Sequence, residues 1–434
     1  MKISILSVFP EIYKNFLETS LVRRAQESDL VKYDLDSFRS FVAPKERIDA
    51  PTFGPGAGMV IKAEVVQRAI ESKEQKNGPA FKIFFSPQGK RLDQNLLRKI
   101  ANLAHKKGHL MLLPARYEGM DDRVEQHYAD EVVSVGDFVL MGGDVPAMVF
   151  LEGFLRLIPG VVGKKESVEM ESFSGAFVDY PSYAEPVDWK GYKVPDVIRS
   201  GNHEAIRKWR LKASAKKTVM HHFNWMRSQP MDVEQRELAQ KYIPSHYAAL
   251  MHYEVLAGNG KPGTTSVTSL DIHDIARSAK SFGIKNYFIV TPLVDQQKIV
   301  KKMIDFWNSG IGKEYNRCRF EAVRQVVLKS SLESVIEQIE KQEGKKPVII
   351  VTSAKSCQKD NVITYHDQEL VWQLGRPVLI LFGTGQGLTE EVIEQADFVL
   401  IPVEGFSGYN HLSVRSAAAI IFDKWLGMNV KKLK

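Results

Sequence analysis

Short apolar segments alternate with amphipathic helices along most of this chain, and the alternation occurs in two separate stretches. Such alternation predicts mostly parallel sheets, because a parallel strand is reached through a crossover connection that is usually a helix. The strands expected in the first stretch are residues 2–9, 82–85, 109–113 and 131–140. Those expected in the second are residues 251–256, 287–291, 348–352, 377–382 and 398–403. The sequence therefore predicts an α/β fold with two parallel-sheet domains.

The segment between the two stretches differs in amino-acid composition. Charged and turn-forming residues increase after about residue 164, and Pro181, Pro186 and Pro195 interrupt the chain. Helices are expected at 202–217 and 232–242. We therefore predict three domains: a sheet domain at 1–164, a small and mostly helical domain at 165–247, and a second sheet domain at 248–434. A length of 434 residues fits about three domains of roughly 150 residues each.

Composition excludes several classes of protein. Hydrophobic residues make up 44% and charged residues 26% of the chain, which is typical of a globular protein and not of a disordered or fibrous one. No apolar run approaches the roughly 18 residues of a membrane span, and Pro10 and Glu11 interrupt the apolar start. The two cysteines, Cys318 and Cys357, are too few for a disulfide framework or a cysteine-based zinc site. We expect a cytoplasmic protein with no membrane contact and no metal site.

One pattern occurs in both sheet stretches. In the first, an apolar strand at 110–113 is followed by Gly119, Val124, the pair Ala129-Asp130 and a further strand. In the second, the strand at 379–382 is followed by Gly387, Val392, the pair Ala396-Asp397 and a further strand. Generic strand–helix units share such spacings by chance. The alternative is that the chain holds two copies of one ligand-binding half-fold.

Glycine-bearing loops follow the strands of both stretches, where ligands bind to parallel sheets. The segment Gly383-Thr384-Gly385-Gln386-Gly387 is one of them. Glycines allow a ligand to approach the backbone, although plain tight turns use them too. It is not a phosphate-binding Walker loop, because no Gly-Lys-Ser/Thr follows it. A nucleotide-binding enzyme that uses this loop for phosphate remains an alternative.

A basic stretch at 199–217 points to a nucleic-acid partner. Its seven lysines and arginines are opposed by Glu204 alone, and Trp209 lies among them. Clusters of this kind bind phosphates, and aromatic rings stack on bases. A solvated helix face is the alternative, but the one-sided charge and the aromatic ring favour RNA. The candidate RNA contacts are Arg199, His203, Arg207, Lys208, Arg210 and Lys212.

Residues 1 to about 247 resemble the bacterial tRNA (guanine-N1)-methyltransferases of the TrmD type. The motifs that carry this resemblance are Phe9-Pro10-Glu11, Ser86-Pro87-Gln88-Gly89, Arg116-Tyr117-Glu118-Gly119, Gly136-Asp137-Phe138-Val139-Leu140, Pro146-Ala147-Met148 and Ser200-Gly201-Asn202-His203. They occur in order and at matching spacing.

Residues from about 248 to 434 resemble a SPOUT-type RNA methyltransferase domain that depends on S-adenosylmethionine. The motifs are Leu270-Asp271-Ile272-His273-Asp274-Ile275-Ala276-Arg277-Ser278, Val290-Thr291-Pro292-Leu293, Leu381-Phe382-Gly383-Thr384-Gly385-Gln386-Gly387 and Tyr409-Asn410-His411-Leu412-Ser413. Arg277 and Arg415 are candidate RNA contacts of this domain.

The resemblances imply a trefoil-knotted fold in both sheet domains and S-adenosylmethionine as the cofactor. The cofactor residues implied for the first site are Ser86, Pro87, Ala115, Tyr117, Glu118, Gly119, Val135, Gly136, Asp137, Phe138, Val139, Leu140, Gly142 and Gly143. Those implied for the second site are Gly383, Gly385, Gly387, Val403, Leu412 and Ser413.

For catalysis, the resemblance implies Arg156, Glu171 and Asp179. Arg156 would hold the charge that develops on the guanine O6, and Glu171 stands where the family has an aspartate that removes the N1 proton. Glutamate keeps the carboxylate but is one methylene longer.

The implied function is a cytoplasmic, homodimeric tRNA methyltransferase that forms N1-methylguanosine beside the anticodon, at tRNA position 37. The second domain would be another RNA methyltransferase or an RNA-docking domain. The alternative is a chain whose first site is impaired, and which acts as a tRNA-binding protein or methylates another nucleotide through its second domain.

Overall fold

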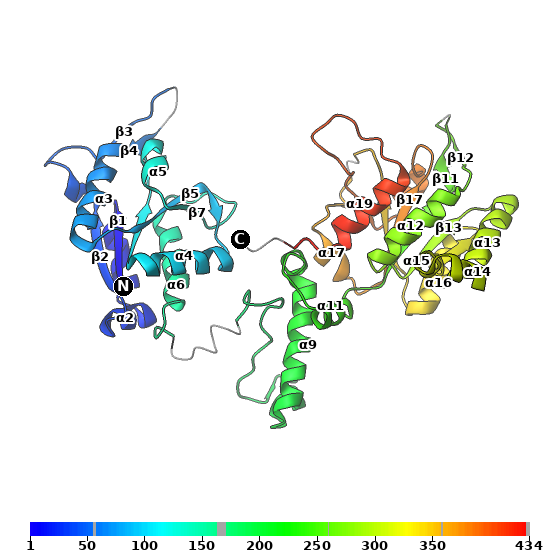
Figure 1. Cartoon of the computed structure of the whole chain (residues 1–434), viewed down its shortest axis with the longest axis horizontal. Helices are drawn as coiled ribbons and strands as arrows, with labels where there is room; N and C mark the ends of the chain where they lie inside the picture. Colours follow the sequence, from blue (N-terminus) through cyan, green and yellow to red (C-terminus); the bar gives the residue numbers. More distant parts are fainter. Residues whose placement is uncertain (55–57, 163–170, 259, 357–358, 431–434) are drawn as a thin grey trace. The chain divides into compact units, whose positions relative to one another are not determined.

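The computed structural model describes residues 1–54, 58–162, 171–258, 260–356 and 359–430 (Figure 1). The chain forms two compact units, Met1–Ser174 and Gly175–Lys434. The domain boundary expected at 164/165 lies outside the described residues, and the division into three domains stays a prediction.

The first unit is built on a sheet of five parallel strands in the order β2-β1-β6-β5-β7. The strands are β1 (Lys2–Ser7), β2 (Lys32–Ser37), β5 (Phe81–Arg91), β6 (His109–Pro114) and β7 (Glu131–Ser134). The central strand β6 is buried at every position. Its run of apolar residues is what a parallel strand covered on both faces requires.

Helices cover both faces of this sheet. Ala25, Leu97 and Phe150 place α2, α4 and α6 in the core of one face, whereas Val65 and Val124 place α3 and α5 on the other. The helices are η1 (Pro10–Tyr13), α1 (Lys14–Leu17), α2 (Ser20–Glu27), η2 (Phe38–Phe41), α3 (Ala63–Asn77), α4 (Gln94–Lys107), α5 (Asp122–Tyr128) and α6 (Asp144–Arg156).

The second unit contains a sheet of seven parallel strands in the order β14-β13-β10-β17-β15-β18-β16. The strands are β10 (His246–Met251), β13 (Asn286–Val290), β14 (Val326–Lys329), β15 (Val348–Thr352), β16 (Val362–Ile363), β17 (Val378–Gly383) and β18 (Phe398–Leu400).

Two cores cover the two faces of the second sheet. Ile275 and Phe422 place α12 and α19 in one core, and Val335 and Val392 place α16 and α18 in the other. The helices are α12 (Ser269–Ser281), α13 (Val294–Asn308), α14 (Gly310–Tyr315), α15 (Arg317–Val323), α16 (Leu332–Glu343), α17 (Gln368–Trp372), α18 (Glu390–Glu394) and α19 (Val414–Leu426).

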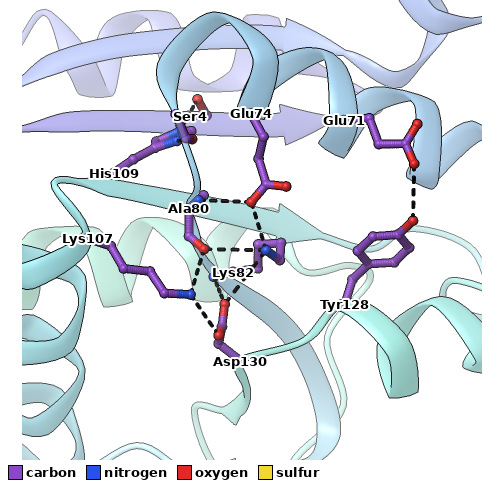
Figure 2. Close-up of polar contacts among 10 residues, drawn as sticks. Ser4, Glu71, Glu74, Ala80, Lys82, Lys107, His109, Tyr128 and Asp130 are labelled. Carbon is purple, nitrogen blue, oxygen red and sulfur yellow. Dashed lines mark hydrogen bonds and ion pairs between the residues drawn. The ribbon is translucent and has the colours of Figure 1, made fainter.

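The two sheets repeat one strand order. When its five strands are numbered in chain order, the first sheet has the spatial order 2-1-4-3-5. The five adjacent strands β13-β10-β17-β15-β18 of the second sheet, numbered among themselves in the same way, have the same order. The repeated Ala-Asp pair has a structural reason. The Asp130 carboxylate accepts the backbone N–H of Lys82 on β5 at 2.8 Å (Figure 2). Asp397 accepts the N–H of Ile349 on β15 at 2.7 Å. The predicted repeat is therefore present in the strand order, and ligand binding by both copies stays a prediction.

The helical segment before the second sheet shares that sheet's core. It comprises the hairpin β8 (Asp188–Trp189) and β9 (Tyr192–Lys193), and the helices α8 (Asp196–Arg199), α9 (His203–His221), α10 (Phe223–Met226) and α11 (Val233–Gln240). The Phe223 ring lies 4.7 Å from the Trp372 ring, centroid to centroid. The buried Arg227 donates from Nη1 to the carbonyl of Lys424 at 2.5 Å. Helix α9 and the second sheet therefore belong to one unit.

Several expected strands differ from those observed, and β2, β14 and β16 are not among those expected. The strand expected at 251–256 is wrong, because the sheet strand is β10 and residues Tyr253–Leu256 form β11 of a separate hairpin. His246 and Tyr247 are fully buried in β10 although they are polar. The strand expected at 131–140 ends at Ser134, and β5 continues beyond 85 through an irregular pairing with β7.

Among the residues that the structure describes, none of the helices combines the length and apolar character that crossing a bilayer would require.

The buried His246 predicts an acid-sensitive second unit. Its Nε2 accepts a hydrogen bond from Trp425 Nε1 at 3.0 Å, and its Nδ1 lies 2.7 Å from the Pro244 carbonyl. Burial lowers its pKa from 6.5 to about 4. The unfolded chain therefore binds one more proton between these pH values, and stability falls as the pH drops through that window. The slope is at most about 1.4 kcal/mol per pH unit.

We expect His246→Gln to remove this slope from the pH dependence of unfolding. The six tryptophans all lie between residues 189 and 425, so tryptophan fluorescence in denaturant titrations reports on the second unit. The difference between wild type and variant isolates His246 from other titrating groups. Identical pH profiles between pH 7 and 4.5 would contradict the assignment.

Candidate functional site

The irregular middle of β5 and the carboxyl ends of β6 and β7 surround a pocket of about 640 Å³. It is lined by thirteen of the fourteen residues predicted for the first cofactor site: Ser86, Pro87, Ala115, Tyr117, Glu118, Gly119, Val135, Gly136, Phe138, Val139, Leu140, Gly142 and Gly143. Asp137 is the remaining one; it is exposed and pairs with Arg91 at 3.5 Å. Three segments that are distant in sequence thus converge on one cavity, and the one at 86–89, expected to be a turn, lies within β5.

The loop after β6 is held in an unusual backbone conformation. Tyr117 has a φ of +60°, which residues other than glycine rarely adopt. A hairpin of β3 (Asp49–Pro51) and β4 (Met59–Ile61) stabilises the loop from outside. Glu118 N donates to the Met59 carbonyl at 2.9 Å, and Ile61 N donates to the Gly119 carbonyl at 3.0 Å. Strained backbone of this kind is typical of ligand sites.

The pocket carries acidic side chains that sequence reasoning did not single out. Asp122 and Glu125 line it together with Glu118. Burial, followed by the nearby charge of Asp122, raises the pKa of Glu125. The sequence signal that could have indicated this acidic pair is its spacing of three residues, which places Asp122 and Glu125 on one face of α5. The pocket is therefore suited to a ligand with positive charge.

The three predicted catalytic residues do not lie in one unit. Arg156 ends α6, and its guanidinium forms an ion pair with Glu171 within the first unit. Both side chains remain partly exposed, at 43% and 31%. Asp179 belongs to the second unit. It is exposed, and its neighbour Tyr180 lies under the Arg210 guanidinium of α9 at 4.4 Å.

The predicted RNA contacts gather on the amino-terminal half of α9. His203, Arg207, Lys208, Arg210 and Lys212 are all exposed there. Arg199 lies just before, on α8, and pairs with Asp196 at 3.8 Å. The carboxyl-terminal half of α9 is buried at Ser214, Ala215, Thr218 and Val219. One half of the helix thus anchors in the core while the other presents cations to solvent.

The glycines predicted for the second cofactor site form a loop that a hairpin covers. The hairpin consists of β11 (Tyr253–Leu256) and β12 (Pro262–Thr264). Leu256 N donates to the Gly387 carbonyl at 2.8 Å, and Gln386 N donates to the Leu256 carbonyl at 2.9 Å. Gly385 has a φ of +62°, and a Cβ there would lie 2.6 Å from the Leu256 oxygen. The loops at 115–119 and 383–387 are therefore each paired with a hairpin.

The other residues predicted for the second site lie in the segment before α19. Ser413 caps that helix by accepting the Ser416 N–H, and Leu412 is exposed. A second pocket of about 340 Å³ lies at the end of β18, but none of the six predicted cofactor residues lines it. Of the predicted RNA contacts, Arg277 is exposed, whereas Arg415 pairs with Asp271 and Asp274 at 3.5 and 3.6 Å.

A buried polar chain supports the second glycine loop. Thr384 Oγ1 donates to the Met251 carbonyl at 2.8 Å and lies 2.5 Å from Thr265 Oγ1. Thr265 Oγ1 is 3.0 Å from Nδ1 of the fully buried His252. Because the Thr384 proton goes to Met251, Thr265 donates to Thr384 and accepts from His252 Nδ1–H. Burial lowers the pKa of His252 to about 4, which keeps it neutral. No sequence motif indicated this chain.

Two family models match the chain. The model described as "tRNA (Guanine-1)-methyltransferase TrmD" matches residues 1–228, and the one described as "SAM-dependent RNA methyltransferase" matches residues 245–427.

Several curated proteins are similar to the chain. A tRNA (guanine-N(1)-)-methyltransferase of Nitratidesulfovibrio vulgaris is 36% identical over 433 residues, which cover 98% of this chain and 99% of the relative. The protein of that name from Bacillus subtilis is 38% identical over 239 residues, covering 55% of this chain and 97% of the relative. A crystal structure of tRNA (m1G37) methyltransferase from Aquifex aeolicus is 31% identical, with a TM-score of 0.41, and covers 48% of this chain and 87% of that one.

The close approach at Gly385 yields a stability prediction. Gly385→Ala places a Cβ against the Leu256 oxygen in a left-handed conformation, so we expect unfolding of the second unit to become easier by about 2 kcal/mol or more. Gly405→Ala is the matched control, because a Cβ there meets nothing within 4 Å and the φ is not positive. Tryptophan-monitored denaturation compares them. Equal stabilities of the two variants would refute the close approach.

Proposed function

The chain belongs to the tRNA (guanine-N1)-methyltransferase family of the TrmD type, and on this premise we propose that it transfers a methyl group from S-adenosylmethionine to N1 of the guanine 3′-adjacent to the anticodon of tRNA. The observation that carries the proposal is the convergence of the three predicted cofactor segments, near residues 86, 117 and 139, on one pocket. Full-length relatives that carry the enzyme's name favour an active enzyme over a tRNA-binding protein with an impaired first site.

The pocket suits this cofactor chemically. S-adenosylmethionine would supply a methyl group activated on a positively charged sulfonium. Glu118, Asp122 and Glu125 surround the pocket with carboxylates that attract such a cation. Backbone groups of the segment 135–143 would recognise the edge of an adenine ring. The cavity volume of about 640 Å³ is in the range expected for a ligand of this size.

The Arg156–Glu171 pair matches the edge of guanine. Guanine presents an N1–H donor beside an O6 acceptor, whereas adenine presents an acceptor at N1 beside a donor at N6. The Glu171 carboxylate accepts and the Arg156 guanidinium donates, so the pair complements guanine and opposes adenine. Glu171 would then take the N1 proton, and Arg156 would stabilise the negative charge that spreads to O6. In-line transfer depends on positioning these groups.

The exposed half of α9 would hold the tRNA. Its cations face solvent in a stripe on one helix, and Trp209 lies 6.2 Å from Tyr183, centroid to centroid. Cations bind the phosphate backbone and aromatic rings stack on bases, so this half suits a partly single-stranded RNA. An enzyme that acts on tRNA would work in the cytoplasm.

The second sheet domain would bind S-adenosylmethionine as well. It matches a family of RNA methyltransferases that depend on this cofactor. Gly383, Gly385 and Gly387 lie at the end of β17, the strand that corresponds to β6 of the first sheet. The same strand order in both domains places the two glycine loops at equivalent positions. We would expect Val403, Leu412 and Ser413 to complete that site.

Two copies of the chain would pair through the first unit. Loop residues Phe138 and Met141 are 57% and 93% exposed, and Val145 and Val149 on α6 are 50% and 51% exposed. Val145 and Val149 lie one turn apart on the same side of the helix. An apolar surface of this kind is a liability in a monomer and is typical of an interface. It supports a homodimer.

The base in the reaction is tested with Glu171→Gln. We expect methyl transfer to a tRNA transcript with guanine next to the anticodon to fall by about 10²- to 10⁴-fold, because glutamine cannot accept the N1 proton. Glu171→Asp keeps the carboxylate and should retain far more activity. A transcript with adenine at that position should gain no methyl group. Full activity of Glu171→Gln would exclude Glu171 as the base.

The dimer is tested with Val149→Glu, which places a charge in the proposed interface. We expect sedimentation velocity to show the wild type as a dimer and the variant as a monomer. Val233→Glu is the matched control: this valine is 69% exposed on α11 of the second unit and should not affect association. A wild-type chain that sediments as a monomer at micromolar concentration would exclude the proposed dimer.

A further inference from the structure

One buried carboxylate joins four elements of the first unit. Asp144, the first residue of α6, is fully buried. Its Oδ1 accepts hydrogen bonds from Ser7 Oγ at 2.6 Å and from the Tyr13 hydroxyl at 3.1 Å. Its Oδ2 accepts from Arg116 Nε at 2.7 Å. The donors come from the end of β1, from η1 and from the loop after β6. A buried carboxylate with three donors is fixed in place, because each lost partner leaves charge without compensation.

Arg116 is held from a second side by an aromatic ring. Its Cζ lies 5.2 Å from the centre of the Phe9 ring. Phe9 N donates at 3.0 Å to Ser7 Oγ, the hydroxyl that itself donates to Asp144. These four residues therefore form a closed set of contacts. Gly142 provides the space, since a Cβ there would lie 2.5 Å from Arg116 Cδ.

The pair links the two loops that form most of the cofactor pocket. Arg116 lies between Ala115 and Tyr117, which both line the pocket, and Asp144 directly follows Gly142 and Gly143, which line it too. Arg116 and Asp144 themselves do not line it. A backbone bond from Gly143 N to the Ala115 carbonyl, 2.7 Å long, reinforces the link. The pair therefore contacts the backbone segments that line the pocket without lining the pocket itself.

We propose that Asp144 is a positioning residue of the cofactor site: through Arg116 it holds the loop 115–119 against the loop 135–143 at the spacing that the cofactor requires. The identity of the cofactor rests on the proposed function. The left-handed Tyr117 next to Arg116 shows why the loop needs such a restraint, because that conformation is unfavourable without one. Tyr13 remains a neutral donor to the carboxylate, since burial and the Asp144 charge raise its pKa.

Asp144→Asn tests this directly, because it keeps the shape of the side chain. The amide oxygen can still accept from Ser7 and Tyr13, but the amide N–H groups then face Arg116 Nε–H, and two donors cannot bond. We expect the KM for S-adenosylmethionine in guanine methylation to rise by about 10- to 100-fold. The kcat at saturating cofactor should stay within about threefold, because Arg156 and Glu171 are unchanged.

The matched control is Glu74→Gln. Glu74 belongs to a partly buried ion pair with Lys82 at 2.8 Å in the same unit, away from the cofactor loops (Figure 2). We expect it to lower the unfolding temperature and leave the KM unchanged. Arg116→Met should reproduce the KM effect of Asp144→Asn, and the double variant should be no worse than the poorer single variant, since both remove one contact.

Hydrogen exchange needs no cofactor, so it tests the role of Asp144 independently of the proposed function. We expect hydrogen exchange at residues 115–119 to accelerate in Asp144→Asn and not in Glu74→Gln. If the wild type methylates no guanine, the proposed function fails, and the exchange experiment still decides whether the pair restrains the loop. A folded Asp144→Asn protein with wild-type KM and wild-type exchange at 115–119 would reduce Asp144 to a purely structural role.

Discussion

The parallel pairing of every strand in the two main sheets is the constraint on which the rest of the structure depends. Parallel strands place all their carboxyl ends at one edge, so segments separated by dozens of residues meet there. In the first unit this brings residues 84–88 of β5 and the loops after β6 and β7 around one pocket. In the second it places the glycine loop of β17 beside the hairpin β11–β12. In each sheet the topology therefore determines which segments meet at the site, whatever side chains those segments carry.

Much of this arrangement could be predicted from the sequence. The alternation of apolar strands and helices predicted two parallel sheets, although β2, β14 and β16 are not among the expected strands. The spacing of the Ala-Asp pairs indicated a repeat. Asp130 and Asp397 show why the spacing recurs, because each accepts a backbone N–H from the equivalent strand of its sheet, β5 or β15. The Ala-Asp pattern is visible in the sequence because a single hydrogen bond between the aspartate and the neighbouring strand requires it.

Other features could not be predicted because they depend on contacts distant in sequence. The strand β10 begins with the polar residues His246 and Tyr247, which tertiary packing buries on opposite faces of the sheet. His246 lies against Trp425 of α19, and Tyr247 lies against Phe288 in the other core. The carboxylate of Asp144 is 28 residues from Arg116 and 137 from Ser7 along the chain. No periodicity connects such residues. The same holds for the row of hydrogen bonds that joins Met251, Thr384, Thr265 and His252. Its members come from segments that are distant in sequence.

The shared core of α9 and the second sheet has a consequence for how such a chain can evolve. A domain joined by a flexible linker can be gained or lost by a single genetic event, because neither partner depends on the other for burial. Here Phe223 and Met226 are buried beside Trp372, and Arg227 donates to a carbonyl of the last helix. A lineage that lost the last domain would expose these residues at once. Each apolar residue buried at this junction therefore raises the free-energy cost of losing the last domain.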